Sequence, residues 1–490
     1  MRCSKGGIGP KVNGGQDANE VDIWPRSGRV SPLFKSKNAL LSVGLISLVT
    51  AAAFENLAAT AALGAIGVAF HTTKQLSMVL TSYLLAEIIG VVALAELAKI
   101  KGARFSLLVG GIIFASGLVL SALSPNIWFL VAARAAQGVG GGSFGSVAYI
   151  VINDYYSREA RPRIFFAFAM AWVAPSLIAP ALAGYVANRF GWQWVFLIVV
   201  PLAVAATIIT QFALRHHRHV RAAAKKSSLP LKRIVNSVLL ALSVFVGLRA
   251  LSEIPNYAWL ITVLPAAAIA AYSLWHIVPA GSFSFAPGVG SVVLLRFLSS
   301  MAFFGVDGYL PLALFQDRGF SLTMAGATLT GASLTWSAGS YWHSRHTAVG
   351  ERSKIFRLGT FIAAIGMLAT VAALGIASLS GWIVVAAWST VALGMGMSYV
   401  SISVALLDVS PREHLEESTA ATSLADLLGI AVATGISGGL IALAFTTNTR
   451  FGVADGLWVD GVFSFALLIL CYVFAANIDH SPALPGFTAT

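Results

Sequence analysis

The chain has 490 residues, of which 57% are hydrophobic and only 11% are charged. Soluble globular domains carry about 25% charged residues, so this composition lies far outside the soluble class and indicates a protein embedded in a lipid bilayer. The formal net charge of +12 does not indicate a nucleic-acid partner, because the basic residues are concentrated on one side of the predicted membrane.

The N-terminal segment, residues 1–37, is polar and contains no apolar stretch before Ala39. A cleavable signal peptide needs an apolar region of about 7–15 residues, so this segment predicts a disordered cytoplasmic tail. The first apolar stretch is then retained as a membrane anchor. The two cysteines, Cys3 in the tail and Cys471 in a late apolar stretch, predict neither a disulfide framework nor a metal site.

Fourteen apolar stretches follow, each close to the length of about 20 residues that a membrane-spanning helix needs. Transmembrane β-strands are about 10 residues long and alternate apolar with polar side chains, a pattern that these stretches lack. The sequence therefore predicts an all-α polytopic membrane protein with fourteen transmembrane helices. The predicted spans are 39–63, 75–98, 104–124, 127–151, 164–187, 193–213, 233–252, 256–276, 290–314, 322–342, 358–379, 382–406, 418–444 and 456–476.

The basic residues set the orientation of the predicted helices. With the N-terminus inside, most of the 32 Lys and Arg residues lie in the tail or in connections on the inner side, as the positive-inside rule requires. We therefore expect both termini in the cytoplasm and the chain in the plasma (inner) membrane. Arg134 and Arg296 lie within predicted spans instead.

The order of the spans predicts two halves. A strongly basic connection, 215–232, follows the six spans of residues 38–214, and we expect it to lie on the anionic inner leaflet. Spans seven and eight, in residues 233–276, are interpreted as an insertion. A second set of six spans occupies 290–478, and residues 479–490 are predicted to be a cytoplasmic tail.

The two sets of six spans also resemble each other weakly. Glu55 in the first span is followed by Gly90 near the end of the second, and Asp307 in the ninth is followed by Gly339 near the end of the tenth. Repeated halves around a site at the bilayer midplane are the architecture of secondary transporters. We therefore interpret the two sets as repeats.

Several ionisable side chains lie inside spans, although each costs at least about 2.5–3.5 kcal/mol at the bilayer centre. They are Glu55, Glu87, Arg134, Asp307 and Asp426. A carboxyl group in a low-dielectric cavity binds its proton more tightly than in water and can exchange it near neutral pH. Glu55 and Asp307 are the first candidates for proton coupling or substrate binding, because they occupy matching places. Alternatively, they pair with Arg134 or with backbone donors to fix packing, and a structural bond would equally suffice for Glu87 and Asp426.

Arg134 in the fourth span cannot lose its charge. It therefore needs a counter-charge or a ring of acceptors, whether it tunes a nearby carboxyl group or only holds the structure. Gly138 and Gly140 belong to a glycine run that follows it. Glycines at these positions would let another helix approach closely.

Prolines predict irregular helices in two other spans. Pro175, Pro180 and Gly184 lie in the fifth span, and Pro311 lies in the ninth, four residues after Asp307. An interior proline breaks the helical hydrogen-bond ladder, so we expect kinks there. A kink can be a static feature or a gating element.

Other functional classes find no support in the sequence. No Gly-x-x-x-x-Gly-Lys-Ser/Thr loop occurs, so we expect no ATP-driven pumping. No metal-ligand or nucleophile constellation stands out either. We therefore expect no enzyme activity, no catalytic residues, no cofactor and no metal.

Two stretches resemble motifs of the major facilitator superfamily. The fourth span reads Leu130-x-x-x-Arg134-x-x-Gln137-Gly138-x-Gly140-Gly141-Gly142, which resembles the fourth-helix motif of that family. The stretch from Phe54-Glu55-Asn56 to Gly64 is similar to the first-helix motif of its fourteen-span drug:proton antiporter branch. Glu55 stands where that branch usually has an aspartate.

Two further stretches match the family less closely. Ala179-Pro180-Ala181-Leu182-Ala183-Gly184 resembles the antiporter motif Gly-Pro-x-x-Gly-Gly, with two glycines replaced by alanine. The connection at 95–104 keeps Gly102 and Arg104 of the family's loop signature Gly-x-Leu-x-Asp-Arg-x-Gly-Arg, but Lys99 replaces the aspartate. The inner gate that this aspartate helps to hold closed must then use another partner, such as Glu96 or Asp154, or be weaker.

The resemblance implies a proton-coupled carrier that exports hydrophobic drugs or toxic compounds by alternating access, with a role in multidrug efflux and antibiotic resistance. Membrane carboxylates would favour cationic substrates. The implied partners are a small-molecule substrate, protons and the lipid bilayer, and the implied assembly is a monomer. The expected motif or gating residues are Gln137, Gly138, Gly140, Pro175, Pro180, Gly184, Gly102, Arg104 and Pro311.

Two other interpretations remain open at this stage. The chain can be a dedicated exporter or symporter of one metabolite, lipid or siderophore. It can also be a membrane sensor or scaffold that transports nothing, although the short external connections leave no room for a sizeable soluble domain.

Overall fold

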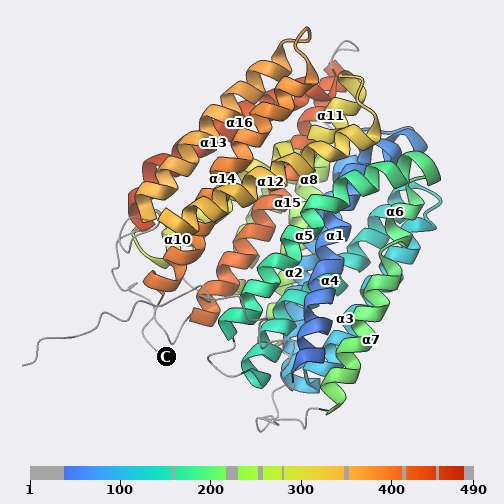
Figure 1. Ribbon diagram of the computed structural model, residues 1–490, viewed down its shortest axis with the longest axis vertical. Coiled ribbons are helices and arrows are strands. Elements are labelled where there is room, and N and C mark those ends of the chain that lie inside the picture. Colours follow the sequence, from blue (N-terminus) through green and yellow to red (C-terminus); the bar gives the residue numbers. More distant parts are fainter. Residues whose placement is uncertain are drawn as a thin grey trace, which may run out of the picture.

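The computed structural model describes eight stretches of the chain, which are residues 38–156, 161–216, 230–251, 258–278, 281–346, 352–410, 415–447 and 452–478. The predicted tails, 1–37 and 479–490, and most of the predicted linker lie outside these residues. Within the described stretches all regular structure is helical (Figure 1). The prediction of an all-helical chain is therefore confirmed for this part of the protein.

The helices follow the predicted spans in chain order. The first six spans correspond to α1 (Ala39–Ala69), α2 (Leu76–Lys101), α3 (Ala103–Ala122), α4 (Ile127–Tyr155), α5 (Arg161–Phe190), α6 (Gln193–Leu197) and α7 (Val200–His216). The seventh and eighth correspond to α8 (Leu231–Leu251) and α9 (Ala258–Ile277). The last six correspond to α10 (Val289–Asp307), α11 (Leu310–Asp317), α12 (Leu322–His346), α13 (Arg352–Gly375), α14 (Gly381–Val409), α15 (Leu415–Thr447) and α16 (Val453–Phe474), followed by a short 3-10 helix, Ala475–Ile478.

Eleven helical segments of the described chain are long and apolar enough to cross a membrane, with α6–α7 and α10–α11 each counted as one segment. The helices outside this group are α4, α9 and α12. α4 and α12 are long enough but less apolar, and the apolar part of α9, Ile261–Ile277, is short. A count of fourteen spans therefore stays a prediction.

Two predicted spans are split at a proline. A proline has no N–H to donate to the carbonyl group four residues earlier. That carbonyl belongs to Leu197 for Pro201 and to Asp307 for Pro311, and these are the residues at which α6 and α10 end. The break before Pro311 lies where the sequence predicts an irregularity. The break before Pro201 was not predicted, although the sixth span still forms one membrane-crossing segment, Gln193–Arg215.

The fifth span is not split at its prolines. α5 continues as one helix through Pro175 and Pro180. The prolines therefore remove two hydrogen bonds from the fifth span without ending its helix.

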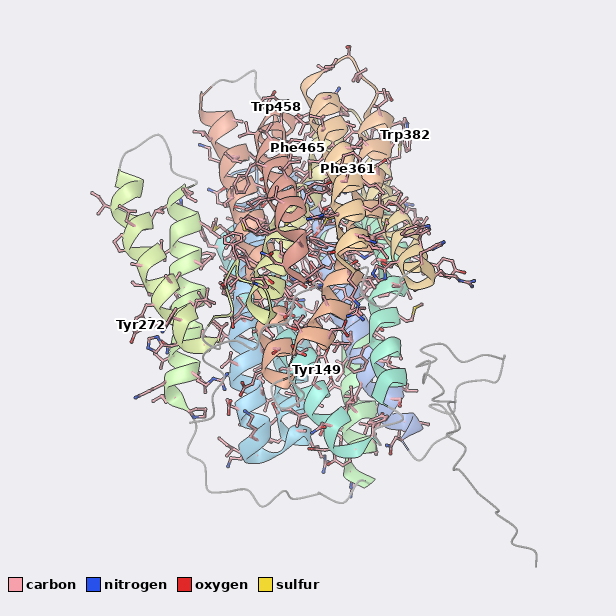
Figure 2. The ribbon with its side chains drawn as sticks, turned by 90° about the vertical axis from the view of Figure 1, so that its left-hand side faces the viewer. Tyr149, Tyr272, Phe361, Trp382, Trp458 and Phe465 are labelled. Atoms are coloured by element: carbon pink, nitrogen blue, oxygen red, sulfur yellow. The ribbon has the colours of Figure 1, made fainter. Side chains whose placement is uncertain are left out.

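The helices form two groups that lie side by side (Figure 1). Helices α1–α7 make up the N-terminal group and α10–α16 the C-terminal group. The groups meet at the top of Figure 1 and diverge toward the bottom. α8 and α9 stand at one side of the molecule, where Tyr272 of α9 is exposed (Figure 2). α8 packs against α2 of the N-terminal group and α15 of the C-terminal group.

The two groups are in contact along two main seams, α5 with α12 and α2 with α15. Glycines allow close approach at the α5–α12 seam. A Cβ atom at Gly184 would clash with the Leu322 carbonyl oxygen, and one at Gly326 would clash with the Pro180 carbonyl oxygen. These residues lie at the end of α5 and the start of α12, which the predicted topology places on the outer side of the membrane.

Replacing Gly184 with valine is expected to lower the melting temperature of the purified protein. The added side chain must push α5 away from the backbone of α12, and overpacking of this kind costs about 1–3 kcal/mol. Gly145→Val is the matched control, because Gly145 also lies in a helix but has no heavy atom within 4 Å of its Cβ position. Equal melting temperatures for the two variants would contradict the close packing of this seam.

Candidate functional site

A buried ion pair joins the first and fourth spans. Arg134 of α4 contacts Glu55 of α1, and each side chain is only 1% exposed. The Nη1 atom of Arg134 also donates to Gln137 Oε1 at 2.7 Å, and its Nε atom donates to the Val79 carbonyl oxygen at 3.3 Å. The guanidinium carbon lies 4.4 Å from the centre of the Tyr83 ring. We call Glu55, Arg134 and Gln137 the N-terminal charge cluster.

The glycine run of α4 explains how Arg134 reaches these partners. A Cβ atom at Gly138 would clash with the Tyr83 carbonyl oxygen of α2, and one at Gly140 would clash with the Phe114 backbone of α3. The run therefore brings α4 into direct contact with the backbones of α2 and α3. One turn earlier on the same helix, Arg134 is held among α1, α2 and α4.

Hydrogen bonding within this cluster is incomplete. Within the described residues, Glu55 Oε2 and Gln137 Nε2 are buried and have no hydrogen-bond partner. Such atoms lose their bonds to water without replacement. The cluster therefore uses only part of its hydrogen-bonding capacity.

Glu87 lies in a different environment from Glu55. It is on α2, one turn after Tyr83, and its side chain is partly exposed. No hydrogen bond or ion pair joins its carboxylate to another described residue. It interacts electrostatically with Glu55 and Arg134 and, across the two groups of helices, with Asp426.

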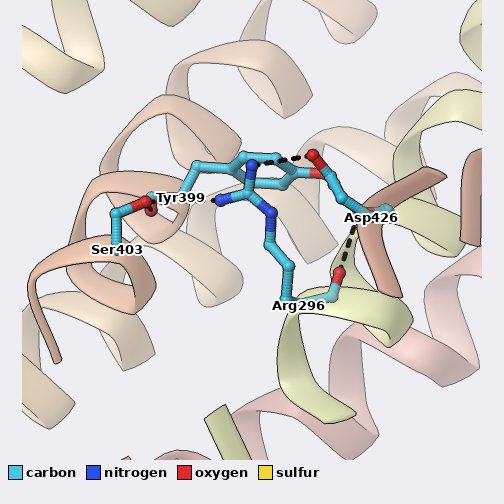
Figure 3. Close-up of polar contacts among 5 residues, drawn as sticks. Arg296, Tyr399, Ser403 and Asp426 are labelled. Atoms are coloured by element: carbon cyan, nitrogen blue, oxygen red, sulfur yellow. Dashed lines mark hydrogen bonds and ion pairs between the residues drawn. The ribbon is translucent and has the colours of Figure 1, made fainter. Parts of the chain in front are cut away.

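A second charge cluster lies in the C-terminal group (Figure 3). Arg296 of α10 donates from Nη2 to Asp426 Oδ2 of α15 at 2.9 Å, and its guanidinium carbon lies 3.8 Å from the centre of the Tyr399 ring of α14. Tyr399 donates its hydroxyl to Asp426 Oδ1 at 3.2 Å, and Ser300 donates to the same oxygen. We call Arg296, Ser300, Tyr399 and Asp426 the C-terminal charge cluster.

The two clusters differ in their access to solvent. The side chains of Arg296 and Asp426 are 16% and 23% exposed, whereas the Glu55–Arg134 pair is almost fully enclosed. Tyr149 of α4, which is labelled in Figure 2 and is exposed, interacts electrostatically with Arg296. The C-terminal charge cluster is therefore less enclosed than the N-terminal charge cluster and lies within electrostatic range of α4 in the N-terminal group.

Asp307 joins neither cluster. It ends α10, is partly exposed, and accepts a hydrogen bond of 3.0 Å from Trp388 Nε1 of α14. The Trp388 ring is stacked on Phe303, with 4.9 Å between the ring centres. Glu55 and Asp307 thus occupy matching places in the sequence, but the first is paired with an arginine and the second with an indole.

A family model described as Major Facilitator Superfamily matches residues 43–295. This match covers more than half of the chain. The chain belongs to the major facilitator superfamily. Membership in this family of transporters supports the prediction that the chain is not an enzyme.

Curated relatives match this major facilitator chain at low identity. The multidrug efflux pump SdrM of Staphylococcus aureus is 23% identical over 448 residues, which are 89% of this chain and 97% of that protein. The MFS-type transporter ppz2 of Metarhizium majus is 30% identical over 183 residues, 37% of this chain and 31% of that protein. The multidrug transporter protein MdtP of Bacillus subtilis is 29% identical over 174 residues, 36% of this chain and 32% of that protein. The chain therefore matches only about a third of the length of the last two relatives.

Solved structures show the same fold. The xylose transporter XylE from E. coli has a TM-score of 0.59 and 15% sequence identity, and the match covers 89% of this chain and 96% of that one. A POT family transporter in complex with 5-aminolevulinic acid has a TM-score of 0.63 and 13% identity, with coverage of 90% and 96%. At these identities the likeness concerns the major facilitator fold alone.

The loop between α2 and α3 carries the residues that the family signature retains. Gly102 has a φ of 91°, which favours glycine, and it connects the two helices. Arg104 Nε donates to Gln211 Oε1 of α7 at 3.3 Å. Glu96, a predicted alternative gate partner, contacts Lys99 at 2.8 Å and Arg233 of α8 at 3.5 Å. In this structure Glu96 therefore links the N-terminal group to the inserted helix α8.

The sequence did not predict a role for three residues, which are Arg296, Tyr399 and Asp460. Arg296 and Asp460 are ionisable residues within spans, which is the signal that selected the other candidates, so both could have been found. Tyr399 carried no such signal, because its position over Arg296 depends on the packing of α14 against α10.

Proposed function

We propose that this major facilitator transporter exports hydrophobic compounds, cationic ones among them, across the plasma membrane in exchange for protons. Both termini would lie in the cytoplasm. The observation that carries the proposal is Glu87, a partly exposed carboxylate that has no bonded partner within the described residues and lies within electrostatic range of Asp426 in the other group of helices. A carboxylate in this position can hold either a proton or a positively charged substrate, but not both.

Charge and aromatic surface support cationic, hydrophobic substrates. Phe304 and Trp336 are partly exposed beside the C-terminal charge cluster, and the Trp336 and Tyr399 ring centres are 4.8 Å apart. Aromatic faces attract cations and also supply apolar contact. The name of the relative SdrM, a multidrug efflux pump that the chain matches over nearly its whole length, supports the outward direction of transport.

The contacts between the two groups of helices support alternating access. The close contacts at Gly184 of α5 and between Ser77 of α2 and Gly438 of α15 lie at the predicted outer ends of these helices. We interpret this arrangement as closed to the outside and accessible from the cytoplasm. A compound would enter from the cytoplasm or the inner leaflet, and protons arriving from outside would displace it after the outer seams open.

Transport in everted membrane vesicles tests the proposal. Vesicles that contain the protein should accumulate ethidium, a lipophilic cation, when their interior is acidic, and a protonophore should abolish the accumulation. One exchanged proton supports a concentration ratio of about tenfold per pH unit. Vesicles without the protein are the control.

Three results would contradict the proposal. Ethidium uptake that does not depend on the pH gradient would exclude proton exchange as the transport mechanism. Transport of a single metabolite from a substrate panel would favour a dedicated carrier. Absence of any flux would favour a sensor or scaffold.

A further inference from the structure

Asp460 of α16 is a buried acid that the proposed exchange mechanism does not use. The residue is 2% exposed, and its Oδ2 atom has no hydrogen-bond partner within the described chain. Ser464, one turn later on the same face, is fully buried, and its hydroxyl also has no partner within the described chain. Two polar side chains of α16 thus point into the helix bundle with unused hydrogen-bonding capacity.

A glycine of α10 makes room for the carboxyl group. A Cβ atom at Gly305 would lie 2.8 Å from Asp460 Oδ2 and 2.8 Å from Ser437 Oγ of α15. The carboxyl group of Asp460 and the hydroxyl of Ser437 therefore meet at Gly305, where α10 has no side chain. The result is a small polar site enclosed by α10, α15 and α16.

No basic side chain neutralises this site among the described residues. α16 packs against α10, α11, α13 and α15. The ionisable residues on these helices are Arg296, Asp307, Asp317, Arg352, Lys354, Arg357, Glu416, Glu417 and Asp426. Within the described chain, the ionisable group that interacts electrostatically with Asp460 is the Tyr309 hydroxyl, which is uncharged near neutral pH.

The absence of a counter-charge favours the neutral acid. An unpaired charge in a protein interior costs several kcal/mol even after relaxation. A protonated carboxyl group avoids this cost and gains a donor that can bond to a neighbouring hydroxyl oxygen. The chemistry of the site therefore suits a proton.

The site lies directly behind the outer α2–α15 seam. Tyr309 donates its hydroxyl to the Thr434 carbonyl oxygen of α15 at 2.9 Å. A Cβ atom at Gly438 would lie 2.7 Å from Ser77 Oγ of α2 and 2.9 Å from the Tyr309 hydroxyl. Separation of α2 from α15 would expose this row of hydroxyl groups, and with it a route from outside to Asp460.

We propose that Asp460, with Ser437 and Ser464, forms a second proton-binding site that is loaded from the outer side when the α2–α15 seam opens. The inference rests on the proposed proton exchange and adds to it a proton carrier remote from the charge clusters. Protons on Asp460 would then contribute to the driving force without competing directly with the substrate.

Two transport measurements distinguish a failure of this inference from a failure of the proposed function. They are ethidium exchange at equal pH and ethidium accumulation driven by a pH gradient. In proteoliposomes, Asp460→Asn should retain ethidium exchange at equal pH, whereas its pH-driven accumulation should fall by about tenfold per pH unit, as expected for one lost proton. Asp455→Asn is the matched control on the same helix, because Asp455 is exposed at the outer end. Accumulation equal to wild type, or an equal loss in both variants, would overturn the inference. Failure of wild-type protein to respond to pH would instead overturn the proposed function.

If Asp460→Asn does not fold, a labelling experiment on the wild-type protein tests whether Asp460 binds a proton. Dicyclohexylcarbodiimide reacts with protonated carboxyl groups in apolar surroundings. Peptide mass spectrometry after treatment at neutral pH should find the adduct on Asp460 and not on Asp455. An unmodified Asp460 in protein that carries the adduct on Glu87 would overturn the inference.

Discussion

Arg134→Met is expected to lower the free energy of unfolding by about 3–5 kcal/mol, because removing one partner of a buried ion pair leaves the other charge uncompensated. Glu55 is 1% exposed and its Oε2 atom already has no partner within the described chain. The variant would have to bury a carboxylate without a counter-charge or take up a proton on it. We also expect transport to be lost, since Arg134 fixes α4 against α1 and α2.

Thermal melting of the purified variants in detergent measures this effect. The double variant Arg134→Met/Glu55→Gln should recover most of the lost stability, because neither remaining side chain is charged. Arg189→Met is the control, since Arg189 is exposed at the end of α5 and exposed charges contribute little. A melting temperature for Arg134→Met close to that of Arg189→Met would mean that the ion pair does not stabilise the fold.

Glu87→Gln is expected to lower both the pH-driven accumulation of ethidium and its exchange at equal pH, because the variant has no carboxylate at this position to hold a proton or the cation. Glutamine resembles the protonated acid and cannot release a proton, so the variant remains permanently in the state that follows proton uptake. Because Glu87 has no bonded partner in the described structure, the substitution breaks no contact that holds the fold. Its melting temperature should therefore match that of the wild type.

The measurement compares ethidium accumulation in vesicles with and without an acidic interior. Glu417→Gln makes the same chemical change at an exposed position on α15 and should accumulate ethidium like the wild type. Normal pH-driven accumulation by Glu87→Gln would remove this residue from proton exchange. The carboxylates of Glu55, Asp307 and Asp426 would then be the next candidates.

The positions of the helices could be predicted because span length and apolarity are local properties of the sequence. The end of α10 before Pro311 follows from the missing N–H of one residue and was also predictable. Close approach at Gly138 and Gly140 follows from the absence of side chains. The same rule applied to Pro201 would have located the break between α6 and α7.

The partners of the charged residues could be predicted only in part. Pairing of Glu55 with Arg134 was one of two alternatives, and the structure contains that pair. The C-terminal charge cluster brings together Arg296, Tyr399 and Asp426 from three helices. Which side chains meet there depends on the rotation of each helix about its axis, and sequence spacing within a single span does not determine the relative rotation of separate helices.

α8 covers one of the two seams between the groups of helices, so the two seams differ in their exposure to the surrounding lipid. α8 packs on both α2 and α15, and Leu248 of α8 occupies the space that a side chain at Gly435 of α15 would need. A molecule dissolved in the bilayer therefore meets the inserted helices before it can reach the α2–α15 seam. On the opposite side, α5 and α12 have no such screen among the described helices. Under the proposed function we therefore expect sideways entry from the inner leaflet on that side.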